Sequence, residues 1–333
     1  MKNIIDTMTI EEKVGQLFLA HCPSEGAEEI VSRLHLGGLL MFAHNFENKT
    51  PDSVRQFTCS CNEAARIPLL IAADEEGGTV VRISKFPQYR AEPFKSPKDI
   101  YASGGFEAVR SEAEEKAGLM LSLGVNYDLA PVCDYTDDDS KYIAKRSFGH
   151  TPEECAEFIR VSVDAMTSAG LCTSLKHFPG YGGNSDTHMG MSTDVRDISE
   201  FEEKDLLPFY AGIAAGAQSV MVAHNIVTCF DPDYPASLSY KVHEYLREKI
   251  GFDGVIITDS LTMNAIRQFT GGADPCVRAL LCGNDMIITS LFEDGYNCIL
   301  NAVKSGVVPM SRLDEAVCRI LQMKRKIGLD IGA

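Results

Sequence analysis

Short, continuously hydrophobic runs recur along the chain, and stretches with the apolar spacing of helices separate them. A run without polar alternation is typical of a parallel strand that is buried on both faces of its sheet. We therefore predict a strand in each of eight runs: VGQLFLA (14–20), GGLLMF (37–42), PLLIAAD (68–74), GVNYDLAP (124–131), LCTSLKH (171–177), QSVMVAH (218–224), GVIITDS (254–260) and DMIIT (285–289).

The segments between the runs predict amphipathic helices. Thr9 followed by Glu12 is a capping-box pattern, which predicts a helix start near the beginning of the chain. Near the other end, Ser311 is the expected N-cap of a last helix whose lysines lie toward its C-terminus. Helical spacing of apolar residues is found in EEIVSRL (28–34), SEAEEKAGLMLSL (111–123) and TPEECAEFIRVSVDAMTSA (151–169).

Strands that alternate with helices indicate an α/β protein with a parallel sheet. Eight is the number of strands that closes a (β/α)₈ barrel, and we predict a single-domain barrel over residues 1–333, with no second domain. A doubly wound open sheet is the competing fold, and the spacing of the runs leaves it open. The barrel predicts that functional side chains gather at the carboxyl ends of the strands.

Charged or imidazole side chains do stand at the ends of five of the predicted strands. This recurrence at one end of the sheet is hard to explain by solubility alone, so it indicates a functional site. Asp74 and Glu75 end the third run, Asp134 and Arg146 follow the fourth, Lys176 and His177 end the fifth, His224 the sixth and Asp259 the seventh.

Composition and charge narrow the class of protein. The chain is 45% hydrophobic, and its net charge of −16 argues against nucleic acid or an anionic membrane as a partner. The first 18 residues have neither a long apolar core nor a small-residue cleavage site, so we expect no signal peptide. Eleven cysteines without a CxxC pair are typical of reduced thiols in a cytoplasmic protein, and no apolar run is long enough for a membrane span.

The stretch IAADEEGGTVVR and the later YIAKRSFG each allow two interpretations. Asp74 could accept hydrogen bonds from substrate hydroxyls in a pocket, with Arg82 returning across the same mouth, or the acids could be solvated on a tight turn. Lys145 and Arg146 could equally form surface ion pairs, which contribute little energy. The absence of a GxGxxG pattern argues against a dinucleotide site.

The stretch KHFPGYGGNSDTH (176–188) gathers ionisable residues around glycines. Its lysine precedes the glycines, so it is no phosphate-binding P-loop. A metal site built from His177, Asp186, His188 and His224 is conceivable, but the spacing matches no helix-borne pair of ligands. The other interpretation is proton transfer, in which Asp186 orients His188 and holds its proton. We predict no metal and no organic cofactor.

The strand GVIITDS ends in Asp259, which could cap a following helix or act as a nucleophile at the barrel mouth.

From MTIEEKVGQLF to MSRLDEAVCRIL, the sequence resembles the bacterial β-N-acetylglucosaminidases of glycoside hydrolase family 3. Five motifs in the family's order carry this resemblance: DEEGGTVVR, LAPVCD…KRSFG, KHFPGYG…DTH, PASLS and GFDGVIITDSLTM. The resemblance implies a (β/α)₈ barrel that removes terminal β-linked N-acetylglucosamine with retention of configuration.

The resemblance also implies a role for each matched residue. Asp259 is expected to be the nucleophile, and His188, paired with Asp186, the general acid and base. The residues expected to bind the non-reducing sugar are Asp74, Arg82, Arg146, Lys176 and His177. The chain departs from the family's pattern at Tyr181, where the family has His or Asn, and in having one residue fewer before Asp186.

The expected substrate is a small carbohydrate, a cell-wall (muropeptide) or chitin-type fragment handled in the cytoplasm, and we expect the enzyme to be a monomer. Other activities stay open: a β-glucosidase or broad-specificity β-glycosidase, a glycoside phosphorylase, a metallohydrolase and a non-catalytic sugar-binding barrel. Each differs from the expected activity in its substrate preference, its phosphate or metal requirement, or its lack of turnover.

Overall fold

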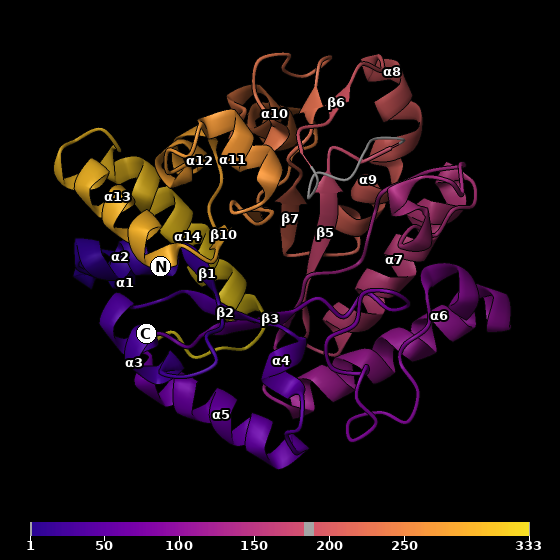
Figure 1. Ribbon diagram of the computed structural model, residues 1–333, viewed down its shortest axis with the longest axis horizontal. Helices are drawn as coiled ribbons and strands as arrows, with labels where there is room; N and C mark the ends of the chain where they lie inside the picture. Colours follow the sequence, from indigo (N-terminus) through magenta and orange to yellow (C-terminus); the bar gives the residue numbers. More distant parts are fainter. Residues whose placement is uncertain (1, 183–189, 333) are drawn as a thin grey trace.

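A computed structural model describes residues 2–182 and 190–332 as a barrel of eight parallel strands surrounded by helices (Figure 1). Every predicted run contributes one strand, and the order around the sheet is β10-β1-β2-β3-β4-β5-β7-β9. The strands are β1 (Phe18–His21), β2 (Gly38–Met41), β3 (Leu70–Ala73), β4 (Tyr127–Asp128), β5 (Cys172–Phe178), β7 (Ser219–Val222), β9 (Val255–Thr258) and β10 (Ile287–Thr289). The prediction of a (β/α)₈ barrel is therefore confirmed, and the open sheet is excluded.

The first run is divided between two elements. The capping box at Thr9 is present, with the Thr9 hydroxyl accepting from the Glu12 amide and the Glu12 carboxylate accepting from the Thr9 amide. It starts a helix whose last turn includes Val14, so that the strand begins only at Phe18. A buried helical turn and a buried strand look alike in a short apolar run.

Helices cover the outside of the barrel. The main ones are α2 (Ile10–Gln16), α3 (Ala27–Leu34), α5 (Pro51–Ala64), α6 (Pro97–Ser122), α7 (Pro152–Ser168), α9 (Leu206–Ala214), α12 (Cys276–Cys282), α13 (Phe292–Lys304) and α14 (Met310–Lys326). Further helices are α1 (Lys2–Thr7), α4 (Ala43–Phe46), α8 (Ile198–Glu200), α10 (Tyr240–Glu244) and α11 (Asn264–Thr270). Single turns are η1 (Tyr142–Lys145), η2 (Phe201–Asp205), η3 (Ala236–Leu238) and η4 (Tyr245–Lys249), and β6 (Thr193–Asp194) pairs with β8 (Ile226–Val227).

The last helix begins before the predicted cap. Its N-cap is Pro309, and the Pro309 carbonyl accepts the first helical bonds, from the amides of Arg312 and Leu313. Ser311 lies inside the first turn, so its prediction as the N-cap is wrong. Proline suits the edge of a helix because it has no amide hydrogen to satisfy there.

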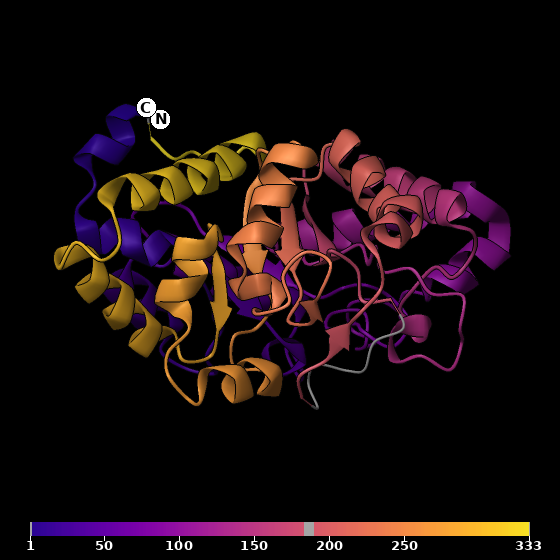
Figure 2. The same ribbon diagram turned by 90° about the horizontal axis from the view of Figure 1, so that it is seen from above.

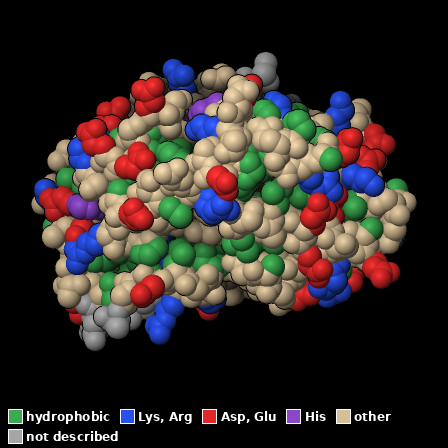
Figure 3. Space-filling model, turned by 90° about the horizontal axis from the view of Figure 1, so that it is seen from below, with side chains coloured by type: hydrophobic (Ala, Val, Ile, Leu, Met, Phe, Trp, Pro, Cys, Tyr) green, Lys and Arg blue, Asp and Glu red, His purple; other side chains and the backbone are tan. Residues whose placement is uncertain are grey.

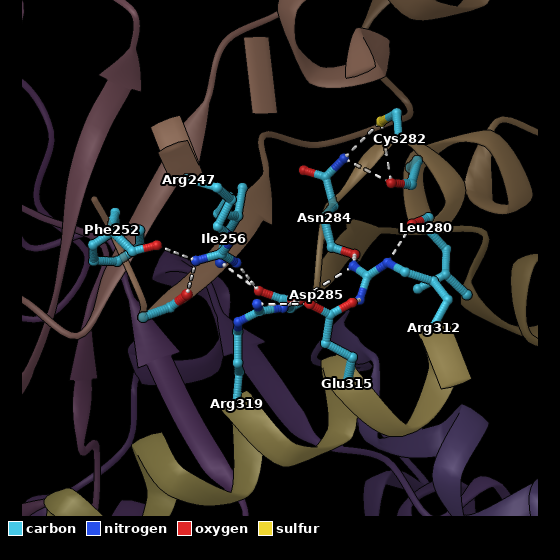
Figure 4. A network of polar contacts seen from close by, with 12 residues as sticks. Arg247, Phe252, Ile256, Leu280, Cys282, Asn284, Asp285, Arg312, Glu315 and Arg319 are labelled. Carbon is cyan, nitrogen blue, oxygen red and sulfur yellow. Dashed lines mark hydrogen bonds and ion pairs between the residues drawn. The ribbon is translucent and has the colours of Figure 1, made fainter. Parts of the chain in front are cut away.

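The barrel closes between β9 and β10, where a parallel bridge joins Ile257 to Met286. Just below this seam, the carboxylate of the buried Asp285 accepts bonds from three guanidinium groups, those of Arg247, Arg312 and Arg319 (Figure 4). The Ile256 amide also donates to Asp285, at 3.0 Å. This network ties α14 and η4, which carry the three arginines, to the seam. Loss of these donors would leave the buried carboxylate of Asp285 unpaired, which would strongly destabilise the fold.

The two ends of the barrel differ in what they carry. Figure 2 shows both chain termini at one end, while α11, β6 and connecting loops lie at the other, toward which the strands point. Figure 3 shows a side of the molecule on which acidic and basic side chains are interspersed rather than gathered into a patch of one sign. No helix among residues 2–182 and 190–332 is long and apolar enough to cross a bilayer.

Candidate active site

A cavity of about 510 Å³ opens at the carboxyl ends of the strands. It brings together all the predicted sugar-binding residues and the predicted nucleophile: Asp74, Arg82, Arg146, Lys176, His177 and Asp259. Asp186 and His188, the predicted proton-transfer pair, lie outside the described residues. Side chains from four of the five strand ends singled out in the sequence therefore meet at one mouth, as a barrel requires.

Asp74 follows β3 and holds two cations across the mouth. Its Oδ1 lies 2.9 Å from Nζ of Lys176, and its Oδ2 lies 3.5 Å from Nη2 of Arg82. The Lys176 side chain is only 2% exposed. Burial alone would lower the pKa of this lysine, but the carboxylates of Asp74 and Glu76 outweigh it and raise the pKa, so the lysine stays charged.

Glu76 is a site residue that the sequence analysis missed. Its carboxylate accepts hydrogen bonds from Nε and Nη2 of Arg146, at 2.9 and 2.8 Å, and lies 2.6 Å from Nζ of Lys176. Burial would raise the pKa of Glu76, but the guanidinium of Arg146 and the ammonium of Lys176 hold it well below the usual range. The third carboxylate of the DEEGG motif was the available signal, since buried cations need a buried partner.

Arg146 is not the surface ion-pair residue that one interpretation suggested. Its side chain is 11% exposed, and it points from the end of η1 into the cavity. The neighbouring Lys145 is exposed, as the surface interpretation expects. The planar guanidinium fits the Glu76 carboxylate through two parallel bonds, a geometry that lysine could not reproduce.

Glu75 is turned away from the mouth and shapes the loop that follows. It accepts bonds from the backbone amides of Arg82, Ile83 and Ser84, and this folds the loop back so that Arg82 faces Asp74. Gly77 has φ +105, and a Cβ there would lie 2.1 Å from the Lys95 carbonyl oxygen. The acids of this motif are therefore not solvated on a turn, because the first and third face the cavity and the second organises the backbone.

His177 is held by the buried Asp134, which follows β4. Oδ2 of Asp134 lies 2.6 Å from Nδ1 of His177 and also accepts from the His177 amide. Oδ1 accepts from the amide of Tyr181, 2.6 Å away. These bonds place the Nδ1 proton toward Asp134 and turn Nε2 toward Arg146, whose Nη2 lies 3.3 Å away.

Asp259 follows β9 and lines the same cavity as this cationic cluster. The next helix, α11, begins at Asn264 with Met263 as its N-cap, so the helix-capping interpretation of Asp259 is wrong. Its Oδ1 accepts from the Ser260 amide at 2.6 Å.

His224 supports this turn instead of lining the cavity. Its Nε2 lies 2.9 Å from the Ser260 carbonyl oxygen and its Nδ1 2.7 Å from the Ser237 hydroxyl, so His224 is engaged with protein groups and is unsuited to the metal ligation considered from the sequence. In the part of the chain that the structure describes, no group of three or more His, Cys, Asp or Glu side chains is arranged to hold a metal ion.

The described start of the glycine-rich segment packs against an ion-pair cluster. Arg196 bonds to both Asp194 and Asp205. A Cβ at Gly180 would lie 2.6 Å from Oδ1 of Asp205, and one at Gly182 would lie 2.3 Å from Nη2 of Arg196. Both glycines also have positive φ, +131 and +52, so close approach and backbone conformation each require glycine here.

Known proteins are similar to this chain along most of its length. Residues 9–323 match the model of the "Glycosyl hydrolase family 3 N terminal domain". A curated beta-hexosaminidase of Xylella fastidiosa (strain M12) is 36% identical over 274 residues, which are 80% of each chain.

Solved structures agree. A family 3 beta-N-acetylglucosaminidase from Paenibacillus sp. str. FPU-7 superimposes with a TM-score of 0.89 at 31% identity, over 98% of this chain and 64% of that one. A family 3 glycosyl hydrolase from Mycobacterium smegmatis superimposes with a TM-score of 0.85 at 27% identity, over 96% of this chain and 98% of the other. With the family model spanning nearly the whole barrel, the chain belongs to glycosyl hydrolase family 3 and is a glycoside hydrolase, as its motifs predicted.

Proposed function

We propose that the protein is a retaining exo-β-N-acetylglucosaminidase. The observation that carries the proposal is a carboxylate, Asp259, that lines one cavity together with a cluster of buried donors and acceptors. Asp74, Lys176 and Arg146 are fixed by ion pairs before any substrate arrives, so they bind sugar hydroxyls without reorganising. The name of the Paenibacillus relative, a beta-N-acetylglucosaminidase, supports N-acetylglucosamine as the sugar, and the name of the Xylella relative, a beta-hexosaminidase, supports a hexosamine.

The reaction that this geometry supports is a double displacement. Asp259 attacks the anomeric carbon as His188 gives a proton to the departing glycosidic oxygen, which leaves a glycosyl ester on Asp259. His188 then takes a proton from water, and the water oxygen attacks the anomeric carbon and releases Asp259 as a carboxylate. The cluster around Lys176 accelerates the reaction where its hydrogen bonds to the hydroxyls strengthen in the transition state.

The pair Asp186 and His188 enters this proposal through the family motif alone. A cytoplasmic, monomeric enzyme acting on cell-wall or chitin-type fragments is likewise part of the proposal, as is the single-domain organisation.

The test is to trap the intermediate with a 2-fluoro glycosyl substrate and to map the labelled peptide. Label on Asp259 supports the mechanism, and label on any other residue overturns it. Rates on 4-nitrophenyl β-N-acetylglucosaminide and on the β-glucoside, with and without added phosphate or chelator, separate the proposed activity from the glucosidase, phosphorylase and metallohydrolase alternatives. A protein that binds these glycosides without turnover would be a sugar-binding barrel.

A further inference from the structure

The inward-pointing side chains of the barrel form layers, and His21 belongs to the layer that carries the candidate chemistry. In a barrel with a shear of about 8, each layer takes one side chain from every second strand. His21 pairs with Leu40, and Leu40 pairs with Ala72. Each strand is staggered by about one residue relative to its neighbour. Two strands on from His21, the residue at the same height therefore lies two positions beyond Ala72, and this residue is Asp74. Repeating this step around the barrel gives the layer His21, Asp74, Lys176 and Asp259.

The layer beneath is apolar and forms the floor of the cavity. It consists of Leu40, Leu129, Met221 and Ile288, one from each intervening strand, and all of them line the cavity. A pyranose ring can place the C–H groups of one face on such a floor and turn its hydroxyls toward the polar layer at its edge. Asp74 and Lys176 supply charged groups at this edge, whereas His21 has no role in the reaction described above.

His21 is a polar side chain without a hydrogen-bond partner in the described structure. Its ring lines the cavity and lies 4.7 Å, centroid to centroid, from the ring of Phe42. Nε2 is buried and makes no hydrogen bond to any described residue. Burial lowers the pKa of His21, against the opposing carboxylates of Asp74 and Asp259, so the imidazole is neutral near neutral pH. A neutral imidazole offers one donor and one acceptor, which matches a hydroxyl group.

Handedness decides which edge of the sugar meets His21. Right-handed crossovers make the strands follow one another counter-clockwise when viewed from the mouth, as β1, β2, β3, β5 and β7 do in Figure 1. Clockwise from Asp259, the layer therefore runs to Lys176, then Asp74, then His21. In a D-pyranose viewed from its β face, the ring carbons run clockwise from C1 to C5.

A retaining β-glycosidase attacks from the α face, which here lies on the floor with C1 at Asp259. C3 and C4 then lie near Lys176 and Asp74, and C5 with its hydroxymethyl group lies near His21. Resting on the proposed function, we propose that His21 is a specificity-determining residue that hydrogen-bonds to the C6 hydroxyl of the terminal sugar. It selects hexosamine substrates with a free C6 hydroxyl.

The test measures kcat/KM of the wild type and of His21→Ala on three substrates: 4-nitrophenyl β-N-acetylglucosaminide, its 6-deoxy analogue and the β-glucoside. The alanine variant should lose about tenfold on the parent substrate, the worth of one hydrogen bond. It should lose less than about twofold on the 6-deoxy analogue, because the partner hydroxyl is already absent. His21→Asn, which keeps a donor and an acceptor, should recover part of the loss and checks the fold, and the exposed His150→Ala is the matched control.

Equal losses on all three substrates would overturn the assignment, since they indicate a merely structural role. A loss that disappears on the glucoside but persists on the 6-deoxy analogue would place His21 at the acetamido group and overturn it as well. No loss on the parent substrate has the same consequence. If the wild type cleaves none of the three glycosides, the proposed function itself fails. If the wild type cleaves them but the alanine variant loses as much on the 6-deoxy analogue as on the parent substrate, only the assignment of His21 fails.

Discussion

Replacing Glu76 with glutamine tests the claim that this buried carboxylate organises the sugar-binding cations. The change keeps the shape of the side chain but removes its charge, and it sets an amide NH₂ against the guanidinium of Arg146 or the ammonium of Lys176. Glu76 and Lys176 are 3% and 2% exposed, so solvent screens the pair little. Removing one partner of such a pair costs about 3–5 kcal/mol of the free energy of unfolding.

The structure places the expected loss toward the lower end of this range. Lys176 keeps Asp74 as a partner at 2.9 Å, whereas Arg146 loses both of its bonds to Glu76. Misplacing the two cations should also lower kcat/KM on the N-acetylglucosaminide by about 10²-fold.

The effect has a defined pH dependence. The folded-state pKa of Glu76 lies below its ordinary value of 4.5, so its stabilisation is present above that value and is lost as the pH falls through the folded-state pKa. The difference between the wild type and Glu76→Gln should therefore be constant from about pH 7 to 5 and should shrink at lower pH, by up to about 1.4 kcal/mol per pH unit.

Urea unfolding followed by circular dichroism at several pH values measures this difference. Glu293→Gln is the control, because Glu293 forms an exposed pair with Arg33 and should cost less than about 1 kcal/mol. A Glu76→Gln protein as stable as the wild type at neutral pH, or one whose deficit is the same at every pH, would refute the reasoning.

Three other changes have distinct expected outcomes. Asp259→Asn should lower kcat on the N-acetylglucosaminide by about 10⁴-fold or more while the protein still binds the sugar in calorimetry, and retained turnover would exclude Asp259 as the nucleophile. Asp128→Asn should stabilise the protein above about pH 7: burial raises the pKa of Asp128 to about 7, so the wild type loses stability as the pH rises from about 4 through that value. Unfolding at a series of pH values checks this, and a gain that does not grow with pH would contradict it. Gly182→Ala should cost about 1–2 kcal/mol more of the free energy of unfolding than Gly271→Ala, measured by thermal unfolding. The φ angles of the two glycines are similar, +52 and +61, but only the Gly182 site has a neighbouring side chain within 4 Å. Equal costs would argue against this close contact.

Most residues of the candidate site could be identified from the family motifs and from the ends of the predicted strands. Buried parallel strands leave their polar residues at the carboxyl ends, so Asp74, Lys176, His177 and Asp259 could be read from the ends of hydrophobic runs. Arg82 could be placed because two glycines after the acids allow the loop to return.

The residues that the sequence analysis missed are those whose role depends on neighbours distant in the chain. Glu76 is marked only as one of three adjacent acids, and its importance comes from Arg146, 70 residues away, and from Lys176. His21 directly follows the first hydrophobic run, and only the stagger of the strands shows that it lies level with Asp259. Asp134 was placed after the fourth run from the sequence, but its role as the partner of His177 follows only from the bonds between the two side chains.

By itself, the sequence determined the alternation of strands and helices, the strand ends that carry chemistry, and the family. These are local properties, since apolar runs, caps and motifs are each readable within a short window. The tertiary structure decided which acid faces a cation, which faces the backbone and which side chains share a layer. Those outcomes depend on barrel closure and strand register, which bring together residues separated by long stretches of chain.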